Sequence, residues 1–261
     1  MIELFMKKRS FSKSYFNIIQ LIFVMSLIIF PQYLFAQNKS INELDKIKKL
    51  FDKSDPIIWV FTGNSITHGN LMTHGYRSYS ELFSERVRYE MLRFRDIVIN
   101  TGISGDVVPR LTKDLEHRVL QFNPTVVSIM MGMNDAAAGP EGREAFRASY
   151  NKLIDRIKEE SDALIILHTP NPITATATRR SDLPAYAQII REIAKNKGVA
   201  LCDQEKMWTE HMERNKTKLI YYIGDGTIHP NRWGHVLLAR NLCKTLGIYD
   251  ENSNTGRFYL P

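Results

Sequence analysis

The succession of short apolar segments constrains the fold more than any other feature of this sequence. Five segments are rich in apolar and β-branched residues, at 57–63, 96–100, 125–132, 163–169 and 198–203. Most of them are apolar throughout rather than at every second residue, which indicates strands covered on both faces of a parallel sheet. Helical spacing of apolar residues characterises the intervening and final segments, at 76–92, 107–122, 142–160, 183–196 and 231–247.

This alternation of strand and helix predicts an α/β fold. Because crossovers between parallel strands are right-handed and place helices on both faces, we expect a three-layer α/β/α sandwich with about five parallel strands. The 261 residues suffice for one large domain, and we predict that it spans 56–248. A polar lead-in at 37–55, with a possible short helix, precedes it, and the polar tail at 249–261 is expected to pack loosely.

The first 36 residues have the order of a secretory signal peptide. A basic leader with Lys7, Lys8 and Arg9 precedes the apolar run at 18–30, and Ala36 is a small residue suited to a cleavage site. The apolar run is short for a membrane-spanning helix, although an uncleaved anchor is the alternative. We therefore predict export to the periplasm or the medium, with no stable membrane insertion once the signal is removed.

Charge and cysteine content exclude several classes of protein. The net charge of +7 belongs partly to the leader, and the remaining basic residues are too few and too scattered to predict nucleic-acid binding. Two cysteines, Cys202 and Cys243, do not make a disulfide framework, and we expect two buried thiols rather than a bridge. Neither a CxxC nor an HExxH spacing occurs, so no metal site is predicted.

Polar loops follow the predicted strands, at the sheet edge where ligands of open α/β sheets bind. In "TGNSITHG", Ser65 lies at a strand-to-helix turn that could expose its hydroxyl as a nucleophile. In "GDGTIHPNRWGH", His229 is the candidate general base, and Asp225 could hold its imidazole in one tautomer. We interpret these three residues as a candidate catalytic triad.

Loops at this edge of the sheet also contain candidate donors for an oxyanion hole. These are the backbone N–H groups of Ser65 and of Gly105 in "NTGISGD", and the side-chain amide of Asn134 in "GMNDAAAG". Each residue has an ordinary structural explanation, since serine and glycine favour turns and Asn134 could cap a helix. Their location at one edge of one sheet favours acyl transfer over those explanations.

From Ile57 to Leu246 the sequence resembles the SGNH hydrolases, also called the GDSL lipase/esterase family. "GNSIT", "NTGISGD", "GMND" and "DGTIHPN" are similar to the family's motif blocks and occur in its order. The resemblance implies a flavodoxin-like sheet, Ser65 as nucleophile and oxyanion donor, Gly105 and Asn134 as further donors, and no cofactor. It also implies that Asp225 and His229 complete the triad.

Two departures from the family pattern affect this interpretation. Asn64 replaces the usual aspartate before the serine, and asparagine can form similar local hydrogen bonds. Asp225 lies four residues before His229, where the family has three, and Gly226 occupies the usual position. Either the loop bulges by one residue so that Asp225 still reaches the imidazole, or Ser65 and His229 act as a pair, with a backbone carbonyl orienting the ring. We favour the bulge over the pair, and over Asp203 as a substitute.

The substrate is the least determined part of the prediction. Asn64, Arg179 and Arg180 are candidate substrate-binding residues, although for the two arginines we favour the alternative of solvated charges at a helix start. Trp208 and Trp233 could stack on sugars, but Trp233 is expected in the core.

Export and the lack of a long apolar lid favour an esterase that removes short acyl groups, mainly acetyl, from a small-molecule or polysaccharide ester. The alternatives are a lysophospholipase or thioesterase and a non-catalytic glycan- or anion-binding module. A His229 turned away from Ser65 would favour the binding module.

Overall fold

The computed structural model describes residues 42–69 and 72–261, so the predicted signal peptide at 1–36 lies outside the described residues. All strand pairs in its single sheet are parallel, and the strand order is β2-β1-β3-β4-β5. The strands are β1 (Ile58–Gly63), β2 (Ile97–Asn100), β3 (Val126–Met130), β4 (Leu164–His168) and β5 (Ala200–Cys202). The predicted five-stranded parallel sheet is therefore confirmed.

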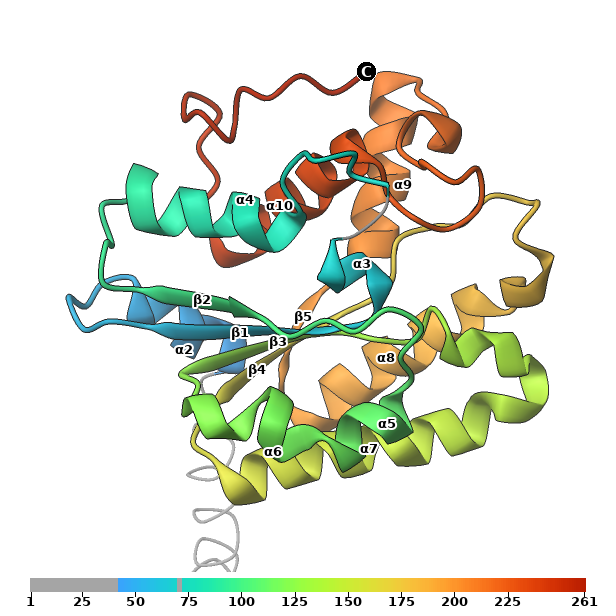
Figure 1. The fold of residues 1–261 in the computed structure, drawn as a ribbon, viewed down its shortest axis with the longest axis horizontal. Coiled ribbons are helices and arrows are strands. Elements are labelled where there is room, and N and C mark those ends of the chain that lie inside the picture. The colour runs from blue at the N-terminus through green and yellow to red at the C-terminus, as the bar shows by residue number, and fades with distance from the viewer. Residues whose placement is uncertain (1–41, 70–71) are drawn as a thin grey trace, which may run out of the picture. The chain divides into compact units, whose positions relative to one another are not determined.

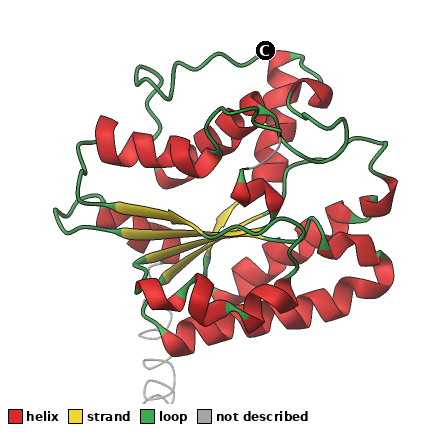
Figure 2. Ribbon diagram, in the orientation of Figure 1, coloured by secondary structure: helices red, strands yellow, loops and turns green. Residues whose placement is uncertain are grey.

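Helices cover both faces of the sheet (Figure 1). On one face lie α2 (Glu43–Leu50), α4 (Tyr79–Glu85), continued by the π-helix η1 (Arg86–Glu90), α9 (Gln204–Asn215) and α10 (Arg232–Leu246). On the other lie α5 (Val108–Lys113), α6 (Leu115–Arg118), α7 (Arg143–Glu160) and α8 (Leu183–Lys197). Figure 2 shows the strands as one central layer between these helices, which confirms the three-layer α/β/α sandwich.

Short helices fill the connections between the longer elements. They are α3 (Ser65–His68), η2 (Leu120–Phe122), η3 (Asp135–Ala138), η4 (Pro140–Gly142), η5 (Thr178–Arg180) and η6 (Leu219–Tyr221). Of these, α3 and η3 follow the carboxyl ends of β1 and β3, the two strands at the centre of the predicted reaction site.

Burial along the central strands explains their sequences. Every residue of β3 is buried, as are all residues of β1 after Ile58. Removing apolar surface from water stabilises the fold by roughly 25 cal/mol per Å². Strands with apolar side chains on both faces gain this stabilisation in full only when helices cover both faces of the sheet. The edge strand β2 is more exposed, with Ile97 at 49%.

The segment 107–122 differs from the single helix expected there. It divides into α5, α6 and η2, because Asp114 and Val119 adopt non-helical backbone angles. The division directs the Arg118 side chain inward, where its guanidinium binds the carbonyl oxygens of Gly63, at the end of β1, and of Thr101, directly after β2. The break is associated with contacts that Arg118 makes to residues outside this segment. The spacing of apolar residues within the segment therefore could not predict it.

The segments at the two ends of the described chain pack more firmly than expected. In the lead-in, α2 packs against β4 and β5 through the fully buried Ile47. The expectation of a loosely packed tail was wrong. Phe258 and Leu260 pack against the core, and Tyr222 donates a 2.9 Å hydrogen bond to the carbonyl oxygen of Pro261.

Helix α9 was not predicted from the sequence. Its side chains are mostly polar, and only Gln204 and Trp208 are fully buried, so the helical spacing of apolar residues is weak. Both cysteines are buried and unpaired, as expected, and burial raises the pKa of each thiol to about 12. Within the described residues, no helix is both long enough and apolar enough to cross a membrane.

Candidate active site

The turn after β1 places Ser65 at the carboxyl edge of the sheet. Strand β1 ends at Gly63, and α3 begins two residues later at Ser65. A Cβ atom on Gly63 would lie 2.6 Å from the carbonyl oxygen of Met130, so only glycine fits between β1 and β3. Asn64 caps α3 by accepting a 3.1 Å hydrogen bond from the backbone N–H of Ile66. The serine is therefore fixed in a sharp turn, and the residue is 8% exposed.

His229 faces this serine from the loop before α10. Its Nε2 atom lies 2.9 Å from the Oγ atom of Ser65, and its Nδ1 atom lies 2.5 Å from the Oδ2 atom of Asp225. A neutral imidazole that donates its Nδ1 proton to the carboxylate has Nε2 free to accept the serine proton. The three side chains thus have the connectivity of a nucleophile, a base and an orienting acid.

Asp225 reaches His229 through a tight local loop. Its Oδ1 atom accepts hydrogen bonds from the backbone N–H groups of Thr227, Ile228 and His229, at 2.8, 2.9 and 3.1 Å. Gly226 provides the extra residue of this loop, with a φ angle of 74° in the left-handed region. The four-residue spacing therefore leaves the carboxylate beside the imidazole.

The same contacts keep Asp225 ionised. Partial burial by itself would raise the pKa of this carboxyl group, but the hydrogen bonds from Thr227, His229 and Ile228 outweigh it. The pKa of Asp225 lies well below its usual value as a result. A carboxylate that stays charged near neutral pH stabilises the imidazolium that forms when His229 accepts a proton.

Three hydrogen-bond donors are located on the loops around Ser65. Within the described residues, the backbone N–H groups of Ser65 and Gly105 have no acceptor. Gly105 has a φ angle of 78°, which a residue with a side chain adopts only with strain. The Asn134 side chain donates one N–H to the carbonyl oxygen of Asp106 at 2.9 Å, which leaves its second N–H available. Asn134 does not cap the following helix with its side chain.

Arg180 has a different position from the one expected of a substrate clamp. Its guanidinium donates to the carbonyl oxygen of Met133 at 3.0 Å and to the Oδ1 atom of Asn134 at 3.1 Å. Burial, with the neighbouring charge of Arg179, lowers the pKa of Arg180. Asn134 is thus held from both ends of its amide, by Arg180 and by the carbonyl of Asp106. Arg179 is exposed and, within the described residues, has no ion-pair or hydrogen-bond partner.

Two other sequence-based candidates are buried. Asn64 is fully buried, so its side chain serves the cap of α3 and does not reach a substrate. Trp208 is also fully buried and packs against Tyr222, which removes it as a platform for sugars. Trp233, expected in the core, is only partly buried. Across residues 42–69 and 72–261, no group of three or more His, Cys, Asp or Glu residues could hold a metal ion.

A buried ion pair beneath the site was missed from the sequence. Arg118 and Asp106 are each 3% exposed and form a salt bridge. Arg118 also donates to the carbonyl oxygens of Thr101 and Gly63, at 3.1 and 2.9 Å. This one side chain therefore joins the segments that carry Ser65 and Gly105. The sequence signal is the place of Arg118 on the apolar face of the helical pattern at 107–122, three residues after Leu115.

The motifs and this geometry agree with the family comparison. Residues 61–237 match the GDSL-like lipase/acylhydrolase family. The chain belongs to this family. The family assignment made from the motifs is confirmed, and with it the prediction of a carboxylic ester hydrolase of the GDSL type at the level of the family.

Two curated proteins illustrate the range of relatives. An acetylxylan esterase of Geobacillus stearothermophilus is 26% identical over 206 residues, which cover 72% of this chain and 93% of that protein. An uncharacterised protein of Mycoplasma pneumoniae is 26% identical over 217 residues, or 75% of this chain. The matching region spans only 25% of the Mycoplasma protein.

Solved structures share the fold. LAE5, an α/β hydrolase enzyme from the metagenome of Lake Arreo in Spain, has a TM-score of 0.63 at 21% identity, covering 76% of this chain and 99% of that chain. Axe2, an acetylxylan esterase from Geobacillus stearothermophilus, has a TM-score of 0.62 at 24% identity, covering 76% and 97%. At these identities the likeness establishes the architecture.

Proposed function

We propose that this protein is an exported serine esterase that removes short acyl groups, mainly acetyl, from carbohydrate. The observation that carries the proposal is the continuous contact from Ser65 Oγ to His229 Nε2 at 2.9 Å and from His229 Nδ1 to Asp225 Oδ2 at 2.5 Å. A binding module has no need for a base aligned on a serine hydroxyl, so this contact favours the enzyme.

The first half-reaction forms an acyl-enzyme. Ser65 Oγ attacks the ester carbonyl carbon while its proton moves to Nε2 of His229, and the imidazolium is stabilised by Asp225. The carbonyl oxygen becomes an oxyanion, which the N–H groups of Ser65 and Gly105 and the free N–H of Asn134 would bind. The bond to the alcohol oxygen then breaks, and His229 returns its proton to that oxygen.

The second half-reaction repeats these roles with water. His229 removes a proton from the water as its oxygen attacks the acyl carbon, and the same donors hold the second oxyanion. The bond to Ser65 Oγ breaks, Oγ regains a proton from His229, and the carboxylic acid leaves. No step requires a group other than side chains, backbone N–H groups and water.

Two observations support acetyl groups on carbohydrate as the substrate class. The curated relative that matches over 93% of its own length is an acetylxylan esterase. The predicted signal peptide would deliver the enzyme to a compartment where polysaccharides are accessible.

The first experiment compares purified residues 37–261 with the Ser65→Ala and Asn134→Ala variants. We expect hydrolysis of p-nitrophenyl acetate and release of acetate from acetylated xylo-oligosaccharide by the parent, and loss of both activities in Ser65→Ala. In Asn134→Ala, kcat should fall on the order of a hundredfold while the protein remains folded at the assay temperature. Turnover of long acyl esters or thioesters without any acetate release would instead assign a lysophospholipase or thioesterase.

A further inference from the structure

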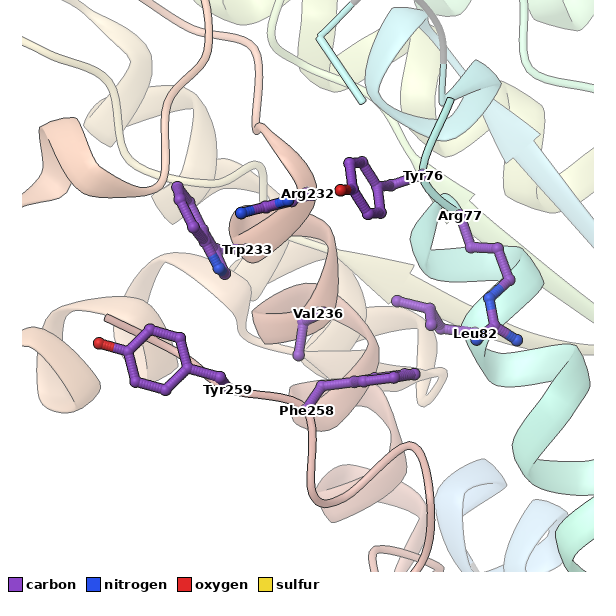
Figure 3. A pocket seen from close by; sticks show the side chains of 8 residues that line it. All are labelled: Tyr76, Arg77, Leu82, Arg232, Trp233, Val236, Phe258 and Tyr259. Carbon is purple, nitrogen blue, oxygen red and sulfur yellow. The ribbon is translucent and has the colours of Figure 1, made fainter. Parts of the chain in front are cut away.

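A cavity that the proposed chemistry does not use lies between α4, α10 and the C-terminal segment (Figure 3). Its volume is about 440 Å³, within the range of sites for small organic ligands. It is lined by four aromatic, two aliphatic and two arginine side chains, namely Tyr76, Trp233, Phe258, Tyr259, Leu82, Val236, Arg77 and Arg232. We refer to it as the aromatic pocket.

Arg232 forms one wall of the aromatic pocket in an unusual setting. Its guanidinium carbon lies 4.7 Å from the ring centre of Tyr76 and 4.3 Å from that of Trp233, so the cation lies between two aromatic rings (Figure 3). Within the described residues it has neither a carboxylate partner nor a hydrogen-bond acceptor. Stacking occupies the faces of a guanidinium and leaves its N–H donors, which point outward in its plane, free to bind a ligand.

The second arginine provides an internal comparison. Arg77 forms a salt bridge with Glu85, and its guanidinium carbon lies 5.5 Å from the ring centre of Phe258. Its charge therefore has a partner within the protein. The unpaired donors of the aromatic pocket belong to Arg232.

The combination of exposed rings and free donors matches a sugar better than a hydrocarbon chain. Tyr76 and Tyr259 are 55% and 73% exposed, so apolar ring surface is open to solvent. The C–H face of a pyranose can pack on such rings, while the hydroxyl groups at its edge accept hydrogen bonds from Arg232. An acyl chain in the same position would cover the Arg232 donors without satisfying them, which is unfavourable.

Two segments that line the aromatic pocket lie close along the chain to residues of the candidate active site. Arg232 begins α10 three residues after His229, so their Cα atoms are separated by at most about 11 Å. Tyr76 lies in the connection from α3, which begins with Ser65, to α4. Tyr76 and Arg232 thus lie on segments adjacent in sequence to those that carry Ser65 and His229.

We propose that the aromatic pocket binds the saccharide portion of the ester, with sugar rings packed on Trp233 and Tyr259 and hydroxyl oxygens bound by Arg232. This inference rests on the proposed function, since it concerns the alcohol half of that substrate. It assigns carbohydrate selectivity to residues outside the triad and the oxyanion donors.

Three variants, Arg232→Gln, Trp233→Ala and Tyr259→Ala, test the proposal against two esters. For acetylated xylo-oligosaccharide, kcat/KM should fall about tenfold in each, mainly through KM. For p-nitrophenyl acetate, which has no sugar, kcat/KM should stay within about twofold. Tyr89→Ala is the matched control, because Tyr89 is 59% exposed and does not line the aromatic pocket.

A binding measurement separates failure of this inference from failure of the proposed function. Calorimetric titration with unacetylated xylo-oligosaccharide should show binding to the parent and weaker binding to Tyr259→Ala, whether or not the parent hydrolyses any ester. Equal losses on both esters, or a selective loss of p-nitrophenyl octanoate turnover, would overturn the saccharide assignment. Unchanged oligosaccharide kinetics in all three variants, together with unchanged binding to Tyr259→Ala, would also overturn it.

Discussion

At the scale of single residues, the contact between Asp225 and His229 makes the most direct prediction. Asp225→Asn preserves the size of the side chain but replaces the charged acceptor of the Nδ1 proton, which allows the wrong tautomer of His229. We expect kcat for p-nitrophenyl acetate to fall about a thousandfold or more, with little change in KM. Activity within tenfold of the parent would mean that Ser65 and His229 act as a pair.

Arg180 is predicted to act through Asn134. Because Arg180 holds the Oδ1 atom of Asn134 and the carbonyl oxygen of Met133, Arg180→Met should lower kcat by about tenfold to a hundredfold. The exposed neighbour provides the control, since Arg179→Met should leave kcat unchanged. In an Asn134→Ala background the Arg180→Met change should cost no further activity, and an additive loss would show that Arg180 acts independently.

At the scale of elements, the buried Arg118 joins the loops that the helices and strands present at the site. Arg118→Met would leave the buried Asp106 with only the mostly exposed Arg110 as an ion-pair partner, so the free energy of unfolding should fall by about 3–5 kcal/mol. Urea unfolding measures this change. Arg110 also pairs with Asp106, at 3.2 Å, but it is 65% exposed, so Arg110→Met should cost about 1 kcal/mol or less. Equal costs in the two variants would contradict the structural role given to Arg118.

The elements that could be predicted from the sequence are those with a local signal. All five strands are apolar over consecutive residues, and the loops after the first three contain the motifs with Ser65, Gly105 and Asn134. The motif with His229 precedes the predicted final helix, so the sheet and the positions of these four residues followed from local pattern. Helix α9 was missed because a mostly polar helix has little apolar periodicity. The roles of Arg118 and Arg180 include contacts with Gly63 and Asn134, which are 55 and 46 positions away and which no local pattern contains.

At the scale of the whole molecule, two buried histidines predict how stability depends on pH. Burial lowers the pKa of both His168 and His235 to about 3, with a further contribution to His235 from His229. His235 accepts a hydrogen bond at Nδ1 from the backbone N–H of Tyr79, which also requires an unprotonated nitrogen there. Both side chains are therefore neutral in the folded protein near neutral pH.

In the unfolded chain these histidines have a pKa near 6.5, so it binds more protons than the folded protein between about pH 6.5 and 3. Stability must then fall as the pH falls through this window. Between pH 7 and 5 each histidine should contribute a loss of about 2 kcal/mol in the free energy of unfolding. Urea unfolding at the two pH values tests this, and His168→Gln should show a smaller loss than the parent. An identical loss would contradict a neutral His168.

The burial of both cysteines offers a route to observing ligand arrival directly. The chain has two cysteines, and both thiols are inaccessible and resist ionisation, so a maleimide dye should leave the folded protein unlabelled. A single new thiol at an exposed position beside the aromatic pocket, as in Arg257→Cys next to Phe258, would then be the only reactive one. A fluorophore attached there would report occupancy of the aromatic pocket in real time, without removal of any native residue elsewhere.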